Sequence, residues 1–550
     1  MILLTLLLAW SSGAPSELES TTASRGATKE APPQALVLTL EDAFRLALDR
    51  NLDLALSAQT EEVARLTSIG TWGSFDPVFS LGANYGDGDI PQANSVITGG
   101  VSVLEAQTES ASLALGVPLT SGGRLDLGLD SSFTQTNSMA TAAEFSDTVV
   151  GIGYTQPLLR GAGVTAATAP QREARILWLR TRELQRETLE SVLLDVANAY
   201  WNLVAAQELV QVRELSVQLG RTQVDQEKQR IEVGLGTEVD LIQAETQVST
   251  ETEQLLLAQN IVAVRADSLR ALISRPGQSG TDGWEDFLSV WDLPIRTLTP
   301  LPEEFAGAST SDSWKTSLGR ALEYRADLGR LRLDIDAAQI RHDLAKNSSL
   351  PILDISLGLQ GNANQTSRTS ALQDALGFDF PGWSAGLSFQ RPLGNRTLRY
   401  AERAARAQLI TARISYEQAE NFVIALVRDA VRDLDYRSQA VRAARQSRQL
   451  AERQLDAEER RQQEGLSTTF QVLQFQRDLA QALSNEAQAK SAYAQAEAAL
   501  LRAEGRLVSA MDLEPLATAG LRGDQPAEAD DRWNWLIGDL KPAEGLRVSP

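Results

Sequence analysis

The feature that most constrains this fold is an internal duplication, because one structural unit is written twice along the chain. The two copies open with LEDAFRLALDRNLDL at residues 40–54 and SLGRALEYRADL at residues 317–328. Each segment predicts the start of a helix of about thirty residues. A proline ends each helix, Pro77 in the first copy and Pro351 in the second, and a strand containing Ser-Leu-Gly follows. The two copies therefore share the order of their predicted elements as well as several of their residues.

The duplication continues through a long helix and a turn into a returning helix. The turns read VGLGTEVDL at residues 233–241 and EGLSTTFQV at residues 464–472. Glycine can end a helix in the left-handed conformation, and Thr237 or Ser467 can cap the next helix. Each unit therefore contains a helical hairpin.

The repeat divides the chain into two similar units. Each unit holds an opening helix, a group of strands and a long hairpin. In the first unit these are residues 38–273, with strands in 77–157 and the hairpin in 171–273. In the second unit they are residues 313–508, with strands in 350–392 and the hairpin in 400–508.

The remaining segments lie between and outside the units. Residues 274–312 are rich in proline, glycine, serine and acidic side chains, which predicts an irregular equatorial connector with a short helix at 284–290. Residues 16–37 read as a flexible segment and residues 509–550 as a tail. The apolar run at the start predicts a secretory signal over residues 1–15, although its usual basic residues are missing. A buried N-terminal helix is the alternative for that run.

The spacing of apolar residues shows how the hairpins are built. Apolar side chains recur at every seventh position of the first long helix, at Leu189, Val196, Leu203, Val210, Val217, Val224 and Ile231. The return helix does the same with Leu241, Val248, Leu255, Val262 and Leu269. Such a sustained repeat is typical of helices packed side by side with left-handed supercoiling. An ordinary coiled coil of a soluble protein would show the same spacing.

The lengths of these helices differ. Residues 171–232 as one helix would be roughly 90 Å long at 1.5 Å per residue. The return helix at 238–273 is shorter. We therefore expect it to stack end to end with the opening helix of its unit, beside the long helix.

The predicted strands alternate in polarity. Apolar residues at 79, 81, 83 and 85 and at 353, 355, 357 and 359 alternate with small or polar ones. This period of two suits a membrane barrel, and it also suits a soluble sheet with one wet face. A further hairpin at 111–134 would bring the count to six strands. That is too few to close a barrel, so a barrel would be shared among chains. Whether this hairpin widens the barrel, extends outside it or folds over its mouth stays open.

Composition excludes several classes of function. The net charge of -21 would repel phosphate backbones, so we expect no nucleic-acid partner. The chain has no cysteine, and its single histidine, His342, has no partner histidine for a metal site. No phosphate-binding loop, nucleophile elbow or metal-ligand motif is present, so we expect no cofactor and no enzyme activity. No segment reaches the 18 or more apolar residues of a membrane-spanning helix, so a span would be made of strands.

The duplicated pattern resembles the TolC-like outer-membrane efflux proteins. The resemblance rests on the paired helix openings, on the strand end Gln156-Pro-Leu-Leu-Arg160 and on the two Gly-Leu turns, and it covers residues 38–508. It implies a mostly α protein with β-strands, assembled as a homotrimer in the outer membrane. A twelve-stranded barrel would cross outer-membrane lipid and continue as an α-helical tunnel in the periplasm.

The resemblance also implies a function. The chain would be the passive channel of a tripartite efflux or type I secretion system. A periplasmic adaptor, also called a membrane fusion protein, would dock at the hairpin tips and connect the channel to an inner-membrane pump of the RND, ABC or MFS class. The transported substrate is not indicated by the sequence. A periplasmic coiled-coil adaptor or scaffold without a pore is the alternative.

Particular residues carry over by position. The resemblance implies that the docking turns contain Val233, Gly234, Leu235, Gly465 and Leu466. Some members of the family narrow the closed pore with two acidic residues after the second turn. Gln471 and Gln474 occupy those positions here, so a ring of carboxylates is not expected. Asp240 is the acidic residue that remains, either restraining the closed state or simply stabilising its helix N-terminus.

Overall fold

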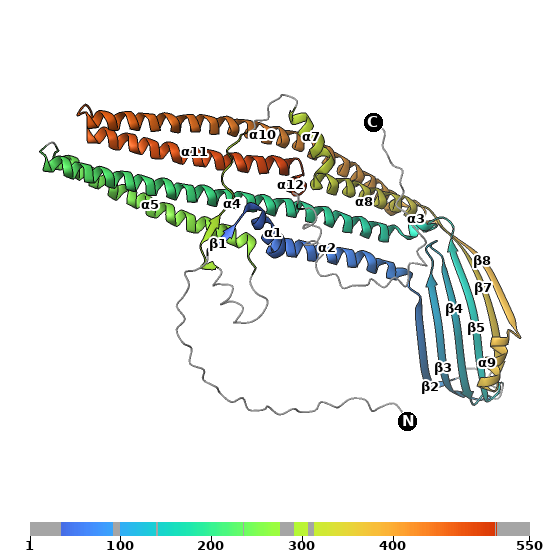
Figure 1. The fold of residues 1–550 in the computed structure, drawn as a ribbon. Coiled ribbons are helices and arrows are strands. Elements are labelled where there is room, and N and C mark those ends of the chain that lie inside the picture. The colour runs from blue at the N-terminus through green and yellow to red at the C-terminus, as the bar shows by residue number, and fades with distance from the viewer. Residues whose placement is uncertain are drawn as a thin grey trace, which may run out of the picture.

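The chain is mostly helical, with one large sheet at one end and two helical hairpin tips at the other (Figure 1). This computed structural model describes residues 35–91, 100–138, 141–234, 236–275, 291–305, 313–511 and 513. The predicted signal over residues 1–15 and the predicted short helix at 284–290 lie outside these residues. Within them, every helix is either too short or too polar to span a bilayer.

Two long helices connect the sheet to the tips. Each runs antiparallel to a return helix of about half its length. The first hairpin is α4 (Ala169–Glu232) and α5 (Glu238–Ile273). The second is α10 (Arg396–Gln463) and α11 (Thr469–Ala503). At 64 residues, α4 is about 96 Å long.

The opening helices are each broken into two, contrary to the single helix of about thirty residues that the sequence predicts. The first pair is α1 (Leu40–Arg50) and α2 (Leu52–Gly70), and the second is α7 (Ser313–Tyr324) and α8 (Ala326–Ser348). The short elements are the 3-10 turn η1 (Thr71–Phe75) and the helices α3 (Val164–Ala167) and α12 (Leu507–Ala510).

Both breaks have the same physical cause. The buried Asn51 accepts the Asp53 and Leu54 N–H groups at the start of α2 and donates to the Leu272 carbonyl at the end of α5. In the second unit Arg325 precedes α8 and donates to the carbonyl of Ala503, the last residue of α11. At each break the end of the return helix therefore meets the start of the second half of the opening helix in the same unit, α5 with α2 and α11 with α8. This confirms the predicted end-to-end stacking.

The seams between helices follow the predicted spacing only in part. On α4 the buried seam includes Leu189, Val196, Leu203, Val217 and Val224. On α5 only Leu269 of the predicted series is fully buried. The other buried positions of α5 are mainly small or polar, and include Ala244, Gln247, Glu251 and Ala258. Small side chains let the two helix backbones approach closely, so hydrophobicity alone did not reveal this seam.

Six antiparallel strands form one sheet in the order β2-β3-β4-β5-β7-β8. They are β2 (Val78–Pro91), β3 (Val103–Pro118), β4 (Arg124–Thr136), β5 (Glu144–Pro157), β7 (Ile352–Gln365) and β8 (Pro381–Gln390). The hairpin predicted at 111–134 lies within β3 and β4, in the middle of the sheet. The resemblance implied four strands per chain, and the sheet has six.

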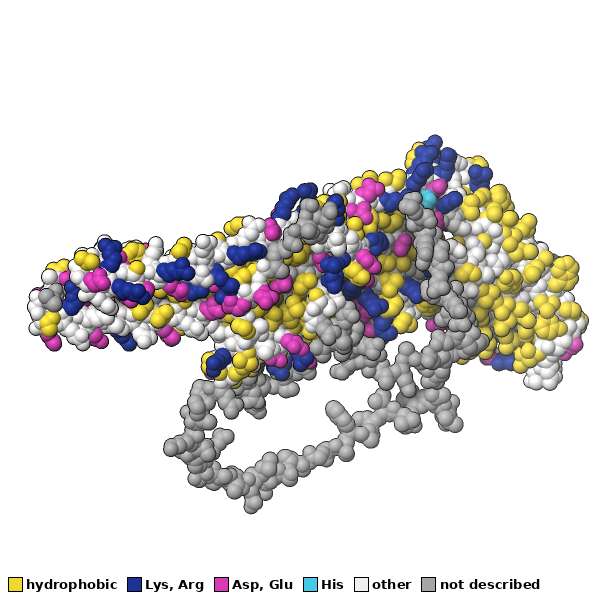
Figure 2. All heavy atoms as spheres, turned by 45° about the horizontal axis from the view of Figure 1, so that its top comes forward, with side chains coloured by type: hydrophobic (Ala, Val, Ile, Leu, Met, Phe, Trp, Pro, Cys, Tyr) yellow, Lys and Arg dark blue, Asp and Glu magenta, His cyan; other side chains and the backbone are white. Residues whose placement is uncertain are grey.

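The two faces of the sheet differ in polarity. One row of directly opposed residues crosses all six strands on one face, and it consists of Phe79, Leu115, Leu127, Ile152, Leu359 and Trp383. The neighbouring row on the other face is Ser80, Ala114, Gly128, Gly151, Gln360 and Gly382. Trp383 is 80% exposed, and hydrophobic side chains gather over the sheet in Figure 2. The chain therefore presents a broad apolar surface. Soluble monomers rarely expose a continuous apolar patch of this kind.

A helix that the sequence does not predict, α9 (Arg368–Gly377), packs on the apolar face of this sheet. Its Ala371 and Ala375 contact Ala363 and Val150. A Cβ at Gly361 would lie 2.2 Å from the Ala375 carbonyl oxygen, so glycine is required for this close approach. The helix covers the strand ends farthest from the hairpins (Figure 1).

The described part of the connector, residues 291–305, is here called the strap. Its strand β6 (Ile295–Thr297) pairs with β1 (Leu36–Leu38), so the predicted irregular connector contributes a strand. The Tyr200 hydroxyl on α4 donates to the Leu38 carbonyl and accepts the Thr299 N–H. These bonds join the strap to the largest buried cluster, where Phe44, Leu193 and Leu203 pack.

A buried carboxyl on α4 makes folding depend on pH. Glu190 lies near Arg186, Arg325, Asp327 and Arg502, and burial raises its pKa from 4.5 to about 7. Between these two values the folded chain holds a proton that the unfolded chain has released. The contribution of protonated Glu190 to the free energy of unfolding is therefore complete below pH 4.5 and is lost as the pH rises through 7.

We expect Glu190→Gln to raise the free energy of unfolding at pH 8 by roughly 1–3 kcal/mol, because it removes a charge from a buried position. The gain should vanish at pH 4, where the wild-type carboxyl is neutral. Thermal unfolding followed by circular dichroism from pH 4 to 8 measures this difference. Glu214→Gln, at an exposed position of the same helix, is the control. An equal gain at both pH values would contradict the assignment.

Candidate functional site

The hairpin tips are tight turns around glycines with positive φ. Gly234 has φ 75° and Gly465 has φ 77°, so both lie in the left-handed region. Gly234 donates to the Ile231 carbonyl and Gly465 to the Gln462 carbonyl, which closes the last turn of each helix. Val233 and Leu466 are exposed on these turns. Leu235 lies outside the described residues.

The tips expose more apolar surface than the turn residues alone provide. Val239 on α5 and Phe470 on α11 are both exposed and occupy equivalent positions after the two turn glycines. Sequence reasoning missed this pair. Lining up the two copies of the turn would have found them, because both residues are apolar next to a helix cap.

The predicted pore residues Asp240 and Gln471 are each held by a cap within their own hairpin. The Thr237 hydroxyl donates to the Asp240 carboxylate at 2.6 Å, and the Asp240 N–H donates back to Thr237. Thr468 and Gln471 form the corresponding capping box. Ser467, one of the predicted caps, instead lies within hydrogen-bond distance of the side-chain oxygens of Gln471 and Glu458, which share its single hydroxyl proton. The cap falls on Thr468 because this residue has the extended backbone of an N-cap.

Gln474, the third predicted pore residue, lies on the exposed side of α11. Its side-chain amide donates to Asp478 at 3.0 Å and accepts from Arg477 at 2.8 Å. Asp478 was missed by the sequence reasoning. It places a carboxylate one helical turn beyond Gln474 on the same helix face as Gln471. This face of the second hairpin therefore carries a carboxylate close to the predicted pore residues.

A buried carboxylate near the tips joins the two hairpins. Glu227 on α4 is 0% exposed, and its Oε1 accepts from Thr469 at 2.7 Å and from Gln462 at 3.4 Å, both on the second hairpin. Gln223 and Arg230 of the same helix donate to this oxygen as well. We call Glu227, Gln223, Gln462 and Thr469 the tip hub. The other oxygen, Oε2, is buried without a hydrogen-bond partner among the described residues, so the four bonds to Oε1 offset the cost of burying this carboxylate, and two of them come from the second hairpin.

The second hairpin carries an equivalent carboxylate in a different environment. Glu458 on α10 precedes its turn glycine by the same number of residues as Glu227 does. Both glutamates pair with an arginine one turn later, Arg230 at 3.4 Å and Arg461 at 3.2 Å. Glu458 also accepts from Ser467, in its own hairpin. Within one chain, only Glu227 uses this position to contact the other hairpin.

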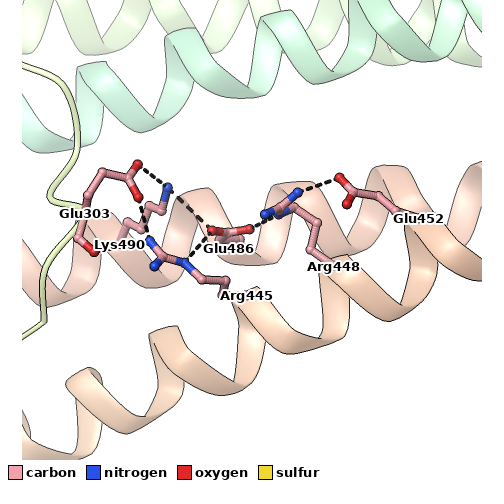
Figure 3. Close-up of polar contacts among 6 residues, drawn as sticks. All are labelled: Glu303, Arg445, Arg448, Glu452, Glu486 and Lys490. Carbon is pink, nitrogen blue, oxygen red and sulfur yellow. Dashed lines mark hydrogen bonds and ion pairs between the residues drawn. The ribbon is translucent and has the colours of Figure 1, made fainter.

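The strap is clamped to the second hairpin by ion pairs. Figure 3 shows Glu303 of the strap pointing to Arg445 on α10 and Lys490 on α11, at 2.6 Å and 3.0 Å. The buried Glu486 lies between these two cations and also pairs with Arg448. The Phe305 ring packs edge to face against Tyr493. The strap therefore ties the second hairpin to the buried cluster of the first, near the middle of the long helices.

The charges of this clamp have physical consequences for nearby carboxyls. Hydrogen bonding from Lys490 lowers the pKa of Glu303, and burial raises the pKa of Glu208 on α4. The ionised Glu303 is thus stabilised where it meets the cations. In the described part of the chain, no group of three or more His, Cys, Asp or Glu residues is arranged to hold a metal ion.

Comparison with known proteins agrees with this architecture. The family described as "Outer membrane efflux protein" matches residues 43–275 and 317–506. The outer membrane protein TolC of Vibrio cholerae serotype O1 is 26% identical over 402 residues, which cover 72% of this chain and 83% of that protein.

Solved structures of outer-membrane channels share the fold. The Campylobacter jejuni channel CmeC superposes with a TM-score of 0.60 at 16% identity, covering 88% of this chain and 89% of CmeC. The channel OprN gives the same TM-score and identity and covers 85% of this chain and 90% of its own. The resemblance drawn from the duplicated motifs is thus confirmed, together with the predicted outer-membrane location. The chain belongs to the outer membrane efflux protein family.

Proposed function

We propose that this chain is the outer-membrane channel of a tripartite efflux or type I secretion system and works as a homotrimer. The observation that carries the proposal is the separation of two surfaces. An apolar sheet lies at one end of the molecule, and exposed hairpin tips lie at the other, with helices about 96 Å long between them. Such a molecule suits a conduit anchored in lipid at one end and docked to a partner at the other.

In this proposal the sheets of three chains close a barrel in outer-membrane lipid, and the hairpins line a tunnel through the periplasm. The polar face of the sheet would face the lumen. Transport would be passive, with energy supplied by an inner-membrane pump of the RND, ABC or MFS class. The proposal assigns no reaction to the chain, because no catalytic motif is recognised in its sequence.

The tips are proposed to do two jobs. Val233, Gly234, Leu235, Gly465 and Leu466, extended by Val239 and Phe470, would contact a periplasmic adaptor. Asp240, Gln471 and Gln474 would face the narrow end of the tunnel. Opening requires the adaptor to bind the open arrangement more tightly than the closed one. The tip hub would oppose opening, because moving the hairpins apart would remove the hydrogen bonds that the buried Glu227 accepts from the second hairpin.

The proposal predicts a pore. The full-length protein, extracted from outer membranes, should migrate as an oligomer that heat dissociates on a denaturing gel. It should also give single-channel currents in planar bilayers, and these currents should be small if contacts such as the tip hub keep the tips closed at rest. A protein that fractionates as a soluble periplasmic monomer and gives no current would instead support the adaptor or scaffold alternative.

The tip hub predicts a gating variant. Glu227→Ala should raise the single-channel conductance severalfold, because Thr469 and Gln462 lose the acceptor that binds the two hairpins together. Glu232→Ala, at an exposed position on the same helix, is the control and should leave conductance unchanged. If Asp240→Ala opens the channel and Glu227→Ala does not, the restraint lies between copies and not within the chain.

The docking surface predicts a specific cross-link. A photoreactive amino acid at Leu466 or Phe470 should capture a periplasmic adaptor in intact cells, because these side chains are exposed at the tip. The same label at Leu256, exposed on α5 away from the turn, is the control. The captured protein is identified by mass spectrometry. Recovery of only this channel from the tip labels, with no adaptor, would contradict the docking role.

A further inference from the structure

The sheet carries two more strands than the four per chain that a twelve-stranded trimeric barrel requires. The two additional strands, β3 and β4, do not lie at an edge of the sheet. β3 pairs along its length with β2 and β4, and β4 pairs along its length with β3 and β5. The pair also shares the polarity of its neighbours, since Leu113, Leu115, Leu127 and Leu129 lie on the apolar face. In pairing and in polarity, β3 and β4 therefore resemble the strands on either side of them.

The apolar face is long enough to cross a bilayer on β7, and on β3 and β4 it is carried by Leu113, Leu115, Val117, Leu125, Leu127 and Leu129. It extends along β7 from Leu353 to the row of Val150 and Gly361, a rise of roughly 25 Å along the strands. Beyond that row the same face carries Ser146, Thr148 and Glu109, and α9 covers part of it. All six strands have ten or more residues, which is enough to cross the hydrocarbon layer when tilted.

The sheet ends in two open edges, β2 and β8. In lipid these edges need a partner, because unpaired N–H and C=O groups are not tolerated there. The six strands alternate in direction, so β2 leaves the helices and β8 returns to them. β8 of one copy can therefore pair antiparallel with β2 of the next. Both edges also expose large apolar side chains on the same face, including Phe79 and Leu81 on β2 and Leu387 and Phe389 on β8.

We propose that three copies of this chain close an eighteen-stranded barrel through β8–β2 pairing between neighbours. This inference rests on the proposed trimeric channel and departs from the twelve strands that the family resemblance implied. Barrel diameter grows about linearly with strand number, so at equal tilt this lumen is about half again as wide as a twelve-stranded one. The occupant of each open edge is a second copy of the same chain. The outer exit of the conduit would then admit bulkier cargo than the resemblance suggests.

The absence of cysteine makes the wall directly testable. Single cysteines at Leu113 and Leu129 place spin labels on the apolar face of β3 and β4, and cysteines at Ser112 and Asp130 place them on the polar face. In the assembled protein in lipid, labels at 113 and 129 should be relaxed more by oxygen, and those at 112 and 130 more by a water-soluble nickel chelate. Water-exposed behaviour at all four positions would overturn the proposal, because the hairpin would then lie outside the wall.

The edge contact is tested separately. Ser80→Cys on β2, combined with Ser384→Cys or Ser388→Cys on β8, places thiols on the polar face of the two edges. Oxidation should give covalent trimers with at least one pair, whereas cross-links confined to monomers would overturn the pairing between copies. Native mass spectrometry gives the copy number. If the accessibility of the four spin labels alternates but the oligomer is not a trimer, the count of eighteen strands is refuted, and β3 and β4 still belong to the wall. If the protein is a trimer and the accessibility of the labels alternates, but it conducts no current in planar bilayers, the result contradicts the channel function and leaves the barrel standing.

Discussion

The long helices α4 and α10 can act as rods only because each is flanked along its length by two shorter helices joined end to end. A helix end exposes backbone groups that need hydrogen-bond partners, so an unsupported junction would be a weak point. Asn51 and Arg325 solve this problem at equivalent places of the two units, by donating to the carbonyls of Leu272 and Ala503. The sheet and the tips are held at fixed separation by these two joints, and the strap ties the first unit to the second hairpin through β6 and Glu303.

The two units share this frame but differ where they meet. The hub at Glu227 binds the first hairpin to the second inside one chain, through Thr469 and Gln462. The equivalent position of the second hairpin, Glu458, binds its own turn. At the corresponding positions of the first hairpin, Thr469 and Gln462 are replaced by Glu238 and Ile231. The first hairpin of a neighbouring copy would thus offer Glu458 no equivalent donors. In the proposed trimer, the hub contact within each chain would therefore have no counterpart between chains at this position.

The duplicated motifs predicted the order of the main elements and the hairpins, because turns and helix starts depend on local chemistry, and the same motifs carried the resemblance to the family. The bounds of α5 agree with the sequence-based prediction for the same reason: Thr237 caps its start, and the apolar series ends near Ser274. The broken opening helices were not predicted, since both halves have helical periodicity and the break depends on a contact with a distant carbonyl. Glu227 was missed because nothing in its local sequence separates a buried glutamate from the many exposed ones. The roles proposed for Asp240, Gln471 and Gln474 stay predictions.

The two extra strands change only one part of the architecture, and strand direction explains why. A hairpin inserted between β2 and β5 adds one outgoing and one returning strand, so every neighbour remains antiparallel. A single added strand would reverse one edge and prevent antiparallel closure with the next copy. The chain enters and leaves the insertion at the outer ends of β2 and β5, far from the hairpins, so the helices need not move within the chain. A family built on paired strands can therefore enlarge its membrane portion by hairpins while the helical part of each chain keeps its fold.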